Sequence, residues 1–122
     1  MSNSALVEDF IRQWEAKSID GILQRMTPDV RYANVGMSEA IGHDAVREGL
    51  APFLGMSSRI EWTVHHIAET ADGVVLTERT DVFEIGDKTI SVPVMGVFEL
   101  KDGLICGWRD YFDLPGFQAQ MA

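Results

Sequence analysis

Apolar positions follow a helical period in the first part of the chain and a strand period in the second. In the first quarter they recur at intervals of three and four residues, at Leu6, Val7, Phe10, Ile11 and Trp14. This spacing predicts a helix, with Asn3 or Ser4 as its N-cap. Further apolar faces predict a short helix over 19–26 and a third one that follows His43-Asp44 and ends at Gly55. Residues 30–34 fit a short strand, and 36–42 fit a loop.

From residue 58 to residue 113 apolar and polar positions alternate, and turn sequences interrupt the alternation. The turns contain Asp72-Gly73, Gly86-Asp87 and Asp102-Gly103. They divide the segment into four strands, 58–70, 74–85, 88–100 and 104–113, joined as an antiparallel meander. Pro93 and Gly96 predict a bulge or bend in the third of these. The expected fold class is α+β, with about three N-terminal helices covering a curved, mainly antiparallel sheet that forms a cone.

Three of the predicted strands place polar groups on faces that are otherwise apolar. Alternation puts Arg79 and Asp81 on one face of 74–85, together with Val75, Phe83 and Ile85. It puts Asp110 on the face of Trp108 and Phe112, and extending it backwards adds Cys106 and Leu104. In the early strand, Tyr32 and Asn34 share a side with Val30.

Burial of these charges is tolerable only if the groups meet one another, because taking an ion out of water costs several kcal/mol. Arg79 and Asp81 alone fit equally well a buried ion pair that only stabilises the fold. A second acid, Asp110, changes this interpretation. One guanidinium cannot fully neutralise two carboxylates, so one carboxyl should keep a proton near neutral pH. A carboxylate and a carboxylic acid held by one arginine can serve as base and acid.

Composition and charge limit the classes of partner. With 122 residues the chain is expected to form a single domain over 1–122. A net charge of −9 argues against a nucleic acid or an anionic membrane surface as partner. A single cysteine, a polar start and the lack of a stretch of transmembrane length predict a cytoplasmic protein. His65 and His66 are adjacent, so on a regular strand they face opposite ways, and no metal site is expected.

The polar residues occur in motifs that resemble the limonene-1,2-epoxide hydrolase family. These motifs are Tyr32-Ala33-Asn34, Arg79-Thr80-Asp81 and the WRDYFD segment around Asp110. The family is a branch of the NTF2-like and SnoaL-like cone-shaped α+β domains, also called cystatin-like, and the resemblance runs from the second helix to the end of the chain. The Tyr-x-Asn, Arg-x-Asp and WRDYFD-like motifs occur in the same order and at the same spacing as in the family.

The resemblance implies a cofactor-independent epoxide hydrolase that converts a small hydrophobic epoxide and water into a vicinal diol. It implies that Tyr32 and Asn34 hold the water, that Asp110 is the base and Asp81 the acid, and that Arg79 bridges the two acids. It also implies a homodimer. Apolar neighbours on the same faces are expected to bind the substrate, namely Phe83, Val92, Val94, Phe112 and, from the C-terminal segment, Phe117.

Two other functions remain open from the sequence. The same cone fold carries isomerases and cyclases that transfer a proton next to a carbonyl, for which Asp110 would be the base and Asp81 or Tyr32 the oxyanion partner. Alternatively, the cavity holds a hydrophobic ligand without any reaction, because one scaffold hosts many functions.

Overall fold

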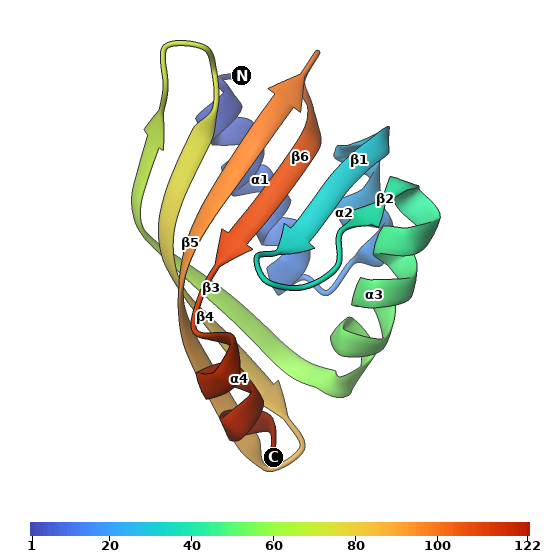
Figure 1. The fold of residues 1–122 in the computed structure, drawn as a ribbon, viewed down its shortest axis with the longest axis vertical. Coiled ribbons are helices and arrows are strands. Elements are labelled where there is room, and N and C mark those ends of the chain that lie inside the picture. Colours follow the sequence, from blue (N-terminus) through green and yellow to red (C-terminus); the bar gives the residue numbers. More distant parts are fainter.

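Six strands form one curved sheet, and the N-terminal helices pack against it (Figure 1). The computed structural model describes residues 1–122. Its elements are α1 (Asn3–Glu15), α2 (Ile19–Gln24), β1 (Met26–Asn34), β2 (Ala40–Ile41), α3 (Gly42–Met56), β3 (Ser57–Glu69), β4 (Val75–Ile85), β5 (Lys88–Lys101), β6 (Leu104–Tyr111) and α4 (Leu114–Met121). Helix α1 packs on β3 and α3 packs on β1. The α+β class expected from the sequence is confirmed.

The strand order in the sheet is β2-β1-β6-β5-β4-β3. Strands β3 to β6 form the expected antiparallel meander. Strand β1 lies beside β6 and runs parallel to it, so that Tyr32 is paired with Trp108 and Asn34 with Asp110. This pairing makes the sheet mixed, and it brings the first strand of the chain next to the last.

The expected boundaries of the early elements needed correction. The side chain of Ser2, rather than Asn3 or Ser4, caps α1 by accepting a hydrogen bond from the backbone N–H of Ala5 at 3.1 Å. Helix α2 ends at Gln24, and β1 begins already at Met26 instead of at residue 30. The pairing of β1 with β6 is irregular between Met26 and Arg31, so the missing N–H of the proline at position 28 removes no regular ladder bond there. Two residues of the predicted loop pair with β1 as β2.

The four predicted strands are present as β3 to β6, and glycines with positive φ angles lie in all three predicted turns, at Gly73, Gly86 and Gly103. The bulge expected at Pro93 or Gly96 is absent, because β4 and β5 stay in one register along their whole length. Pro93 lies beyond the point where β6 ends beside β5, so on that side it interrupts no ladder.

Extra residues in β6 and β3 change which face of the sheet some side chains occupy, compared with the prediction from alternation. The β5–β6 register shifts where Gly107 and Ile105 oppose consecutive residues of β5, so Cys106 is the extra residue of a bulge. Consequently Ile105 lies in the core, whereas Leu104 and Cys106 are only half-buried. A similar shift in β3 makes His65 an extra residue. His65 and His66 therefore do not face opposite ways as expected: both contact side chains on the outer face of β4, Thr80 and Glu78.

The C-terminal segment forms a helix that the sequence pattern did not predict. Strand β6 ends at Tyr111 instead of residue 113, and α4 follows it. The side chain of Asp113 accepts a hydrogen bond from the backbone N–H of Gly116 at 3.1 Å and caps α4. Gln120 bonds the backbone of Ser91 in both directions, at 2.9 and 3.0 Å, which holds α4 against β5.

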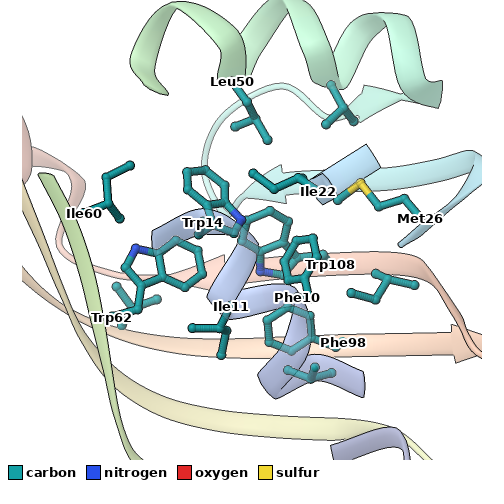
Figure 2. Close-up of a cluster of buried hydrophobic side chains, with 14 of the residues drawn as sticks. Phe10, Ile11, Trp14, Ile22, Met26, Leu50, Ile60, Trp62, Phe98 and Trp108 are labelled. Carbon is teal, nitrogen blue, oxygen red and sulfur yellow. The ribbon is translucent and has the colours of Figure 1, made fainter. Parts of the chain in front are cut away.

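Aromatic side chains fill the space between α1 and the sheet (Figure 2). Trp14 from α1 stacks on Trp62 from β3, with 4.6 Å between ring centroids. Trp108 from β6 lies against Phe10 of α1 and Phe98 of β5. Among the helices, none has the length and hydropathy that crossing a lipid bilayer requires.

Candidate active site

Arg79 holds both buried acids at once. Its Nε and Nη2 donate to Asp81 Oδ1 and Oδ2 at 3.0 and 2.9 Å. Its Nη1 and Nη2 donate to Asp110 Oδ1 and Oδ2 at 3.3 and 3.0 Å. All three side chains are buried, with 1%, 3% and 5% of Arg79, Asp81 and Asp110 exposed. The guanidinium therefore satisfies two carboxyls from different strands, as the sequence analysis required of them.

The bridge from β4 to β6 crosses β5 at a glycine. In the sheet register, Gly96 lies between Thr77 of β4 and Asp110 of β6. A Cβ atom at residue 96 would overlap Arg79 Nη1 and would lie 2.8 Å from Asp110 Oδ1. The glycine thus leaves the space through which Arg79 reaches Asp110.

Three further side chains hold the bridge in place, and the sequence analysis did not assign them a role. Thr77 Oγ1 accepts a hydrogen bond from Arg79 Nη1 at 3.0 Å. The Trp108 indole N–H donates to Asp110 Oδ1 at 2.8 Å. The guanidinium carbon of Arg79 lies 4.4 Å from the centre of the Trp62 ring, a cation–π contact. Thr77 and Trp108 were recognisable in the sequence, since each lies two residues from a charged residue on the same face of a strand.

Tyr32 and Asn34 lie beside Asp110, because β1 pairs with β6. The Tyr32 hydroxyl donates to Asn34 Oδ1 at 3.1 Å, which orients the amide. Tyr32 also stacks on Trp108 with 4.3 Å between ring centroids. All five polar residues predicted from the sequence are therefore gathered at one place in the fold.

Burial dominates the ionisation of the acids. It raises the pKa of Asp81 to about 6, against the opposing effect of Arg79. It also raises the pKa of Asp110, and Arg79 and Trp108 oppose it there. Burial and the nearby Asp110 raise the pKa of the Tyr32 hydroxyl, which keeps it protonated. For Arg79, burial favours the neutral form, but the two carboxylates outweigh it and raise its pKa. One permanent cation, Arg79, thus faces two acids. The two carboxyl groups together therefore favour a state in which one of them keeps its proton.

The acids open onto a cavity of about 300 Å³. Its polar lining consists of Tyr32, Asn34, Ser38, Asp81 and Asp110, and no lysine, arginine or histidine reaches it. The remaining lining is apolar or small, and it comes from α1, α3, α4, the sheet and two loop residues, Met37 and Phe112. All five residues expected to bind substrate lie in this wall, namely Phe83, Val92, Val94, Phe112 and Phe117. Arg79 lies behind the wall, in contact with both acids but not with the cavity.

Possible metal ligands are not clustered in this structure. No group of three or more His, Cys, Asp or Glu side chains is arranged to hold a metal ion. His65 and His66 bond to the outer face of the sheet, away from the cavity.

Comparisons with known proteins agree with this geometry. Residues 1–122 match the family model described as the limonene-1,2-epoxide hydrolase catalytic domain. The chain is 39% identical over 111 residues to the epoxide hydrolase EphG of Mycobacterium tuberculosis, an alignment that covers 88% of this chain and 71% of EphG.

Solved structures give the same result at the level of the fold. The structure of an M. tuberculosis LEH-like epoxide hydrolase superposes with a TM-score of 0.84 at 33% identity, covering 97% of this chain and 87% of the other. A SnoaL-like protein from Shewanella denitrificans superposes with a TM-score of 0.85 at 11% identity, covering 98% of this chain and 96% of the other. The second likeness concerns the fold alone.

Proposed function

The chain belongs to the limonene-1,2-epoxide hydrolase family, and from this we propose that it is an epoxide hydrolase that adds water to a small hydrophobic epoxide in one step and releases a vicinal diol. The observation that carries the proposal is the double bridge from Arg79 to Asp81 and Asp110 at the wall of an apolar cavity. In the proposed reaction it supplies a base and an acid that line the same cavity.

In the proposed reaction, Asp110 is ionised and takes a proton from a water molecule. Asn34 Oδ1 has a lone pair left after accepting the Tyr32 bond. The water transfers one proton to Asp110 and keeps the other, with which it donates a hydrogen bond to Asn34 Oδ1, so that an oxygen lone pair is free to attack an epoxide carbon. Positioning of this kind accounts for a large part of the acceleration in enzymes that join two reactants.

Asp81 is protonated in the proposed reaction and gives its proton to the epoxide oxygen as the C–O bond breaks. After the step, Asp110 carries the proton and Asp81 is ionised. Arg79 Nη2 donates to both acids, to Oδ2 of Asp81 and to Oδ2 of Asp110, so the guanidinium balances the charge in either state and allows the proton to return. The reaction then needs no metal or organic cofactor, and no ester with the enzyme forms.

A single turnover in ¹⁸O-labelled water tests direct attack by water. The label is expected in the first diol released and not in the protein. If the first diol is unlabelled and the label appears in an aspartate, a carboxylate is the nucleophile and the one-step reaction is wrong.

The cavity favours a neutral substrate. Its lining offers no cation to pair with an anionic group, and most of it is apolar. A panel of racemic and meso epoxides, including cyclic and terpene-like ones, is expected to give diols with the protein and none with Asp110→Asn. Charged analogues such as epoxides with a carboxylate should react much more slowly, because an unpaired ion is costly in such a cavity.

Isomerisation or cyclisation next to a carbonyl would use the same acids differently. It has no need of a water-holding pair, whereas Tyr32 and Asn34 lie beside Asp110 in this fold. Conversion of an enone by the protein, with no diol from any epoxide, would favour that reaction. A protein that binds these compounds but converts none of them would be the ligand-binding module.

The family resemblance further supports a cytoplasmic homodimer without nucleic acid or membrane partners. Met95 and Tyr111, both about half exposed, lie on the outer face of the sheet, where a second copy could cover them. Light scattering after size exclusion tests this, with twice the chain mass of 13.6 kDa as the expected result.

A further inference from the structure

Trp108 contacts two of the groups on which the proposed function rests. Its indole N–H donates to Asp110 Oδ1 at 2.8 Å, and its ring stacks on that of Tyr32 at an interplanar angle of 25°. None of its side chain is exposed. The donor is therefore shielded from water. A hydrogen bond to a carboxylate is stronger in such a buried place than in water.

The surrounding rings fix the orientation of this indole (Figure 2). Phe98 stacks on it with 5.7 Å between centroids and 12° between planes, on the β5 side. Phe10 and Trp14 from α1 meet it edge-on, at 5.2 and 5.7 Å. With all these contacts in place the ring has no room to turn, so the N–H stays directed at Asp110.

This hydrogen bond is made to only one of the two acids. Asp81 and Asp110 each accept two bonds from Arg79. Trp108 donates to Asp110 only. A hydrogen bond to an ionised carboxylate stabilises the ionised form.

We propose that Trp108 is a positioning residue that makes Asp110, and not Asp81, the ionised member of the pair, so that it decides which acid is the base in the proposed hydrolysis. The role of Asp110 as a base rests on the proposed function. The preferential ionisation of Asp110 does not, because it is a property of the free protein.

The other groups around Asp110 do not discriminate in this way. The titratable or charged side chains near it are Arg79 and Asp81 from β4 and Tyr32 from β1. Strand β5 contributes the uncharged Gly96 at this point. Arg79 donates hydrogen bonds to both acids, and the Tyr32 hydroxyl donates its hydrogen bond to Asn34 rather than to Asp110.

The test compares Trp108→Phe with a matched control, Trp14→Phe. Both replace an indole by a phenyl ring in the same aromatic cluster and in the wall of the same cavity. The Trp14 N–H, however, has no hydrogen-bond partner. The carboxyl carbons of aspartates are followed by ¹³C NMR against pH, and Asp110 is assigned from its absence in Asp110→Asn.

In Trp108→Phe the Asp110 carboxyl should titrate about one pH unit higher, because a hydrogen bond to a charged group is lost. The acidic limb of kcat/KM for epoxide hydrolysis should move by the same amount. Trp14→Phe should move neither. An unchanged Asp110 titration in Trp108→Phe, or an equal shift in Trp14→Phe, would overturn the proposal.

A second measurement needs no substitution at Trp108, which is central to the core. The chain has three tryptophans, so the indole ¹H–¹⁵N signals of Trp14 and Trp62 are assigned from their Phe variants and the third belongs to Trp108. In otherwise unchanged protein, this signal should shift with the same midpoint as the Asp110 carboxyl. A Trp108 signal that stays constant through that titration would refute the inference.

These titrations do not depend on turnover. If the native protein gives no diol but the two midpoints coincide, the proposed function fails and the role of Trp108 in ionisation stands.

Discussion

At the scale of single residues, the site depends on the lack of a side chain at Gly96. It lies on the inner face of β5, between Thr77 and Asp110 in the sheet register. Any larger residue would occupy the space of the Arg79 guanidinium. The sequence showed a glycine inside a strand and suggested a bulge. The structure shows instead that the strand is regular and that the glycine makes room for the bridge.

Gly96→Ala should therefore impair both stability and activity. Arg79 is held by Thr77 and both acids, so it cannot move away without losing hydrogen bonds. We expect a loss of about 1–3 kcal/mol in the free energy of unfolding, as for other overpacked sites, and a large decrease in kcat. Urea denaturation and kinetics measure the two effects. Gly55→Ala, at a position with open space around it, is the control, and similar behaviour of the two variants would contradict the assigned role.

Replacing either acid by an amide should stop the reaction while leaving the fold intact. In Asp110→Asn the base is lost, and in Asp81→Asn the acid is lost, so diol formation should fall by at least about 100-fold in each. Near-UV circular dichroism should show an unchanged aromatic core. Glu78→Gln, on the outer face of β4, should keep its activity. More than a few per cent of native activity in either Asn variant would remove that acid from the mechanism.

At the scale of elements, the parallel pairing of β1 with β6 assembles the site. It brings the Tyr32–Asn34 pair to Asp110 across most of the chain length. The Cys106 bulge matters here as well, because it changes the phase of alternation within β6. Trp108 and Asp110 face inward after the bulge, and Ile105 does so before it.

Helix α4 closes part of the cavity wall through Phe117. Its N-cap is the exposed Asp113, whose loss should cost about 1 kcal/mol of local stability. Asp113→Ala should therefore loosen Phe117 and raise KM for hydrophobic epoxides more than it lowers kcat. Steady-state kinetics measure this. Asp113→Asn keeps an acceptor oxygen for Gly116 and should behave like the native protein, so an equal increase in KM in both variants would exclude capping as the cause.

At the scale of the whole molecule, the unbalanced acid makes stability depend on pH. One guanidinium faces two buried carboxyls, and burial raises the pKa of Asp81 from 3.8 to about 6. The folded state therefore binds a proton more tightly than the unfolded state does. The stability that this proton gives is complete below about pH 4 and is lost as the pH rises through about 6.

Between about pH 4 and pH 7, native protein should lose on the order of 1–3 kcal/mol of unfolding free energy relative to Asp81→Asn. The Asn variant cannot ionise at residue 81, so it lacks this contribution to the pH dependence of stability. Urea denaturation at several pH values gives the difference between the two proteins. Asp29→Asn, at an exposed position, should track native protein, and a pH-independent difference for Asp81→Asn would show that Asp81 does not titrate in this range.

The sequence by itself determined the α+β order of elements, the meander and the inward faces of Arg79, Asp81 and Asp110. These follow from local rules, since side chains alternate along a strand and recur every three to four residues along a helix. Local rules also gave the five polar residues, because polar groups on otherwise apolar faces are conspicuous. They failed at His65 and Cys106, where an extra residue changes the phase of a strand.

Only the tertiary structure decided which strands are neighbours. The β1–β6 pairing, the space above Gly96 and the donation from Trp108 to Asp110 join residues through the sheet register. The C-terminal helix likewise depends on contacts with β5 that its weakly patterned sequence does not reveal. A pattern along one strand reports which side chains point inward, but it carries no information on what they meet there, because that depends on the packing of distant segments.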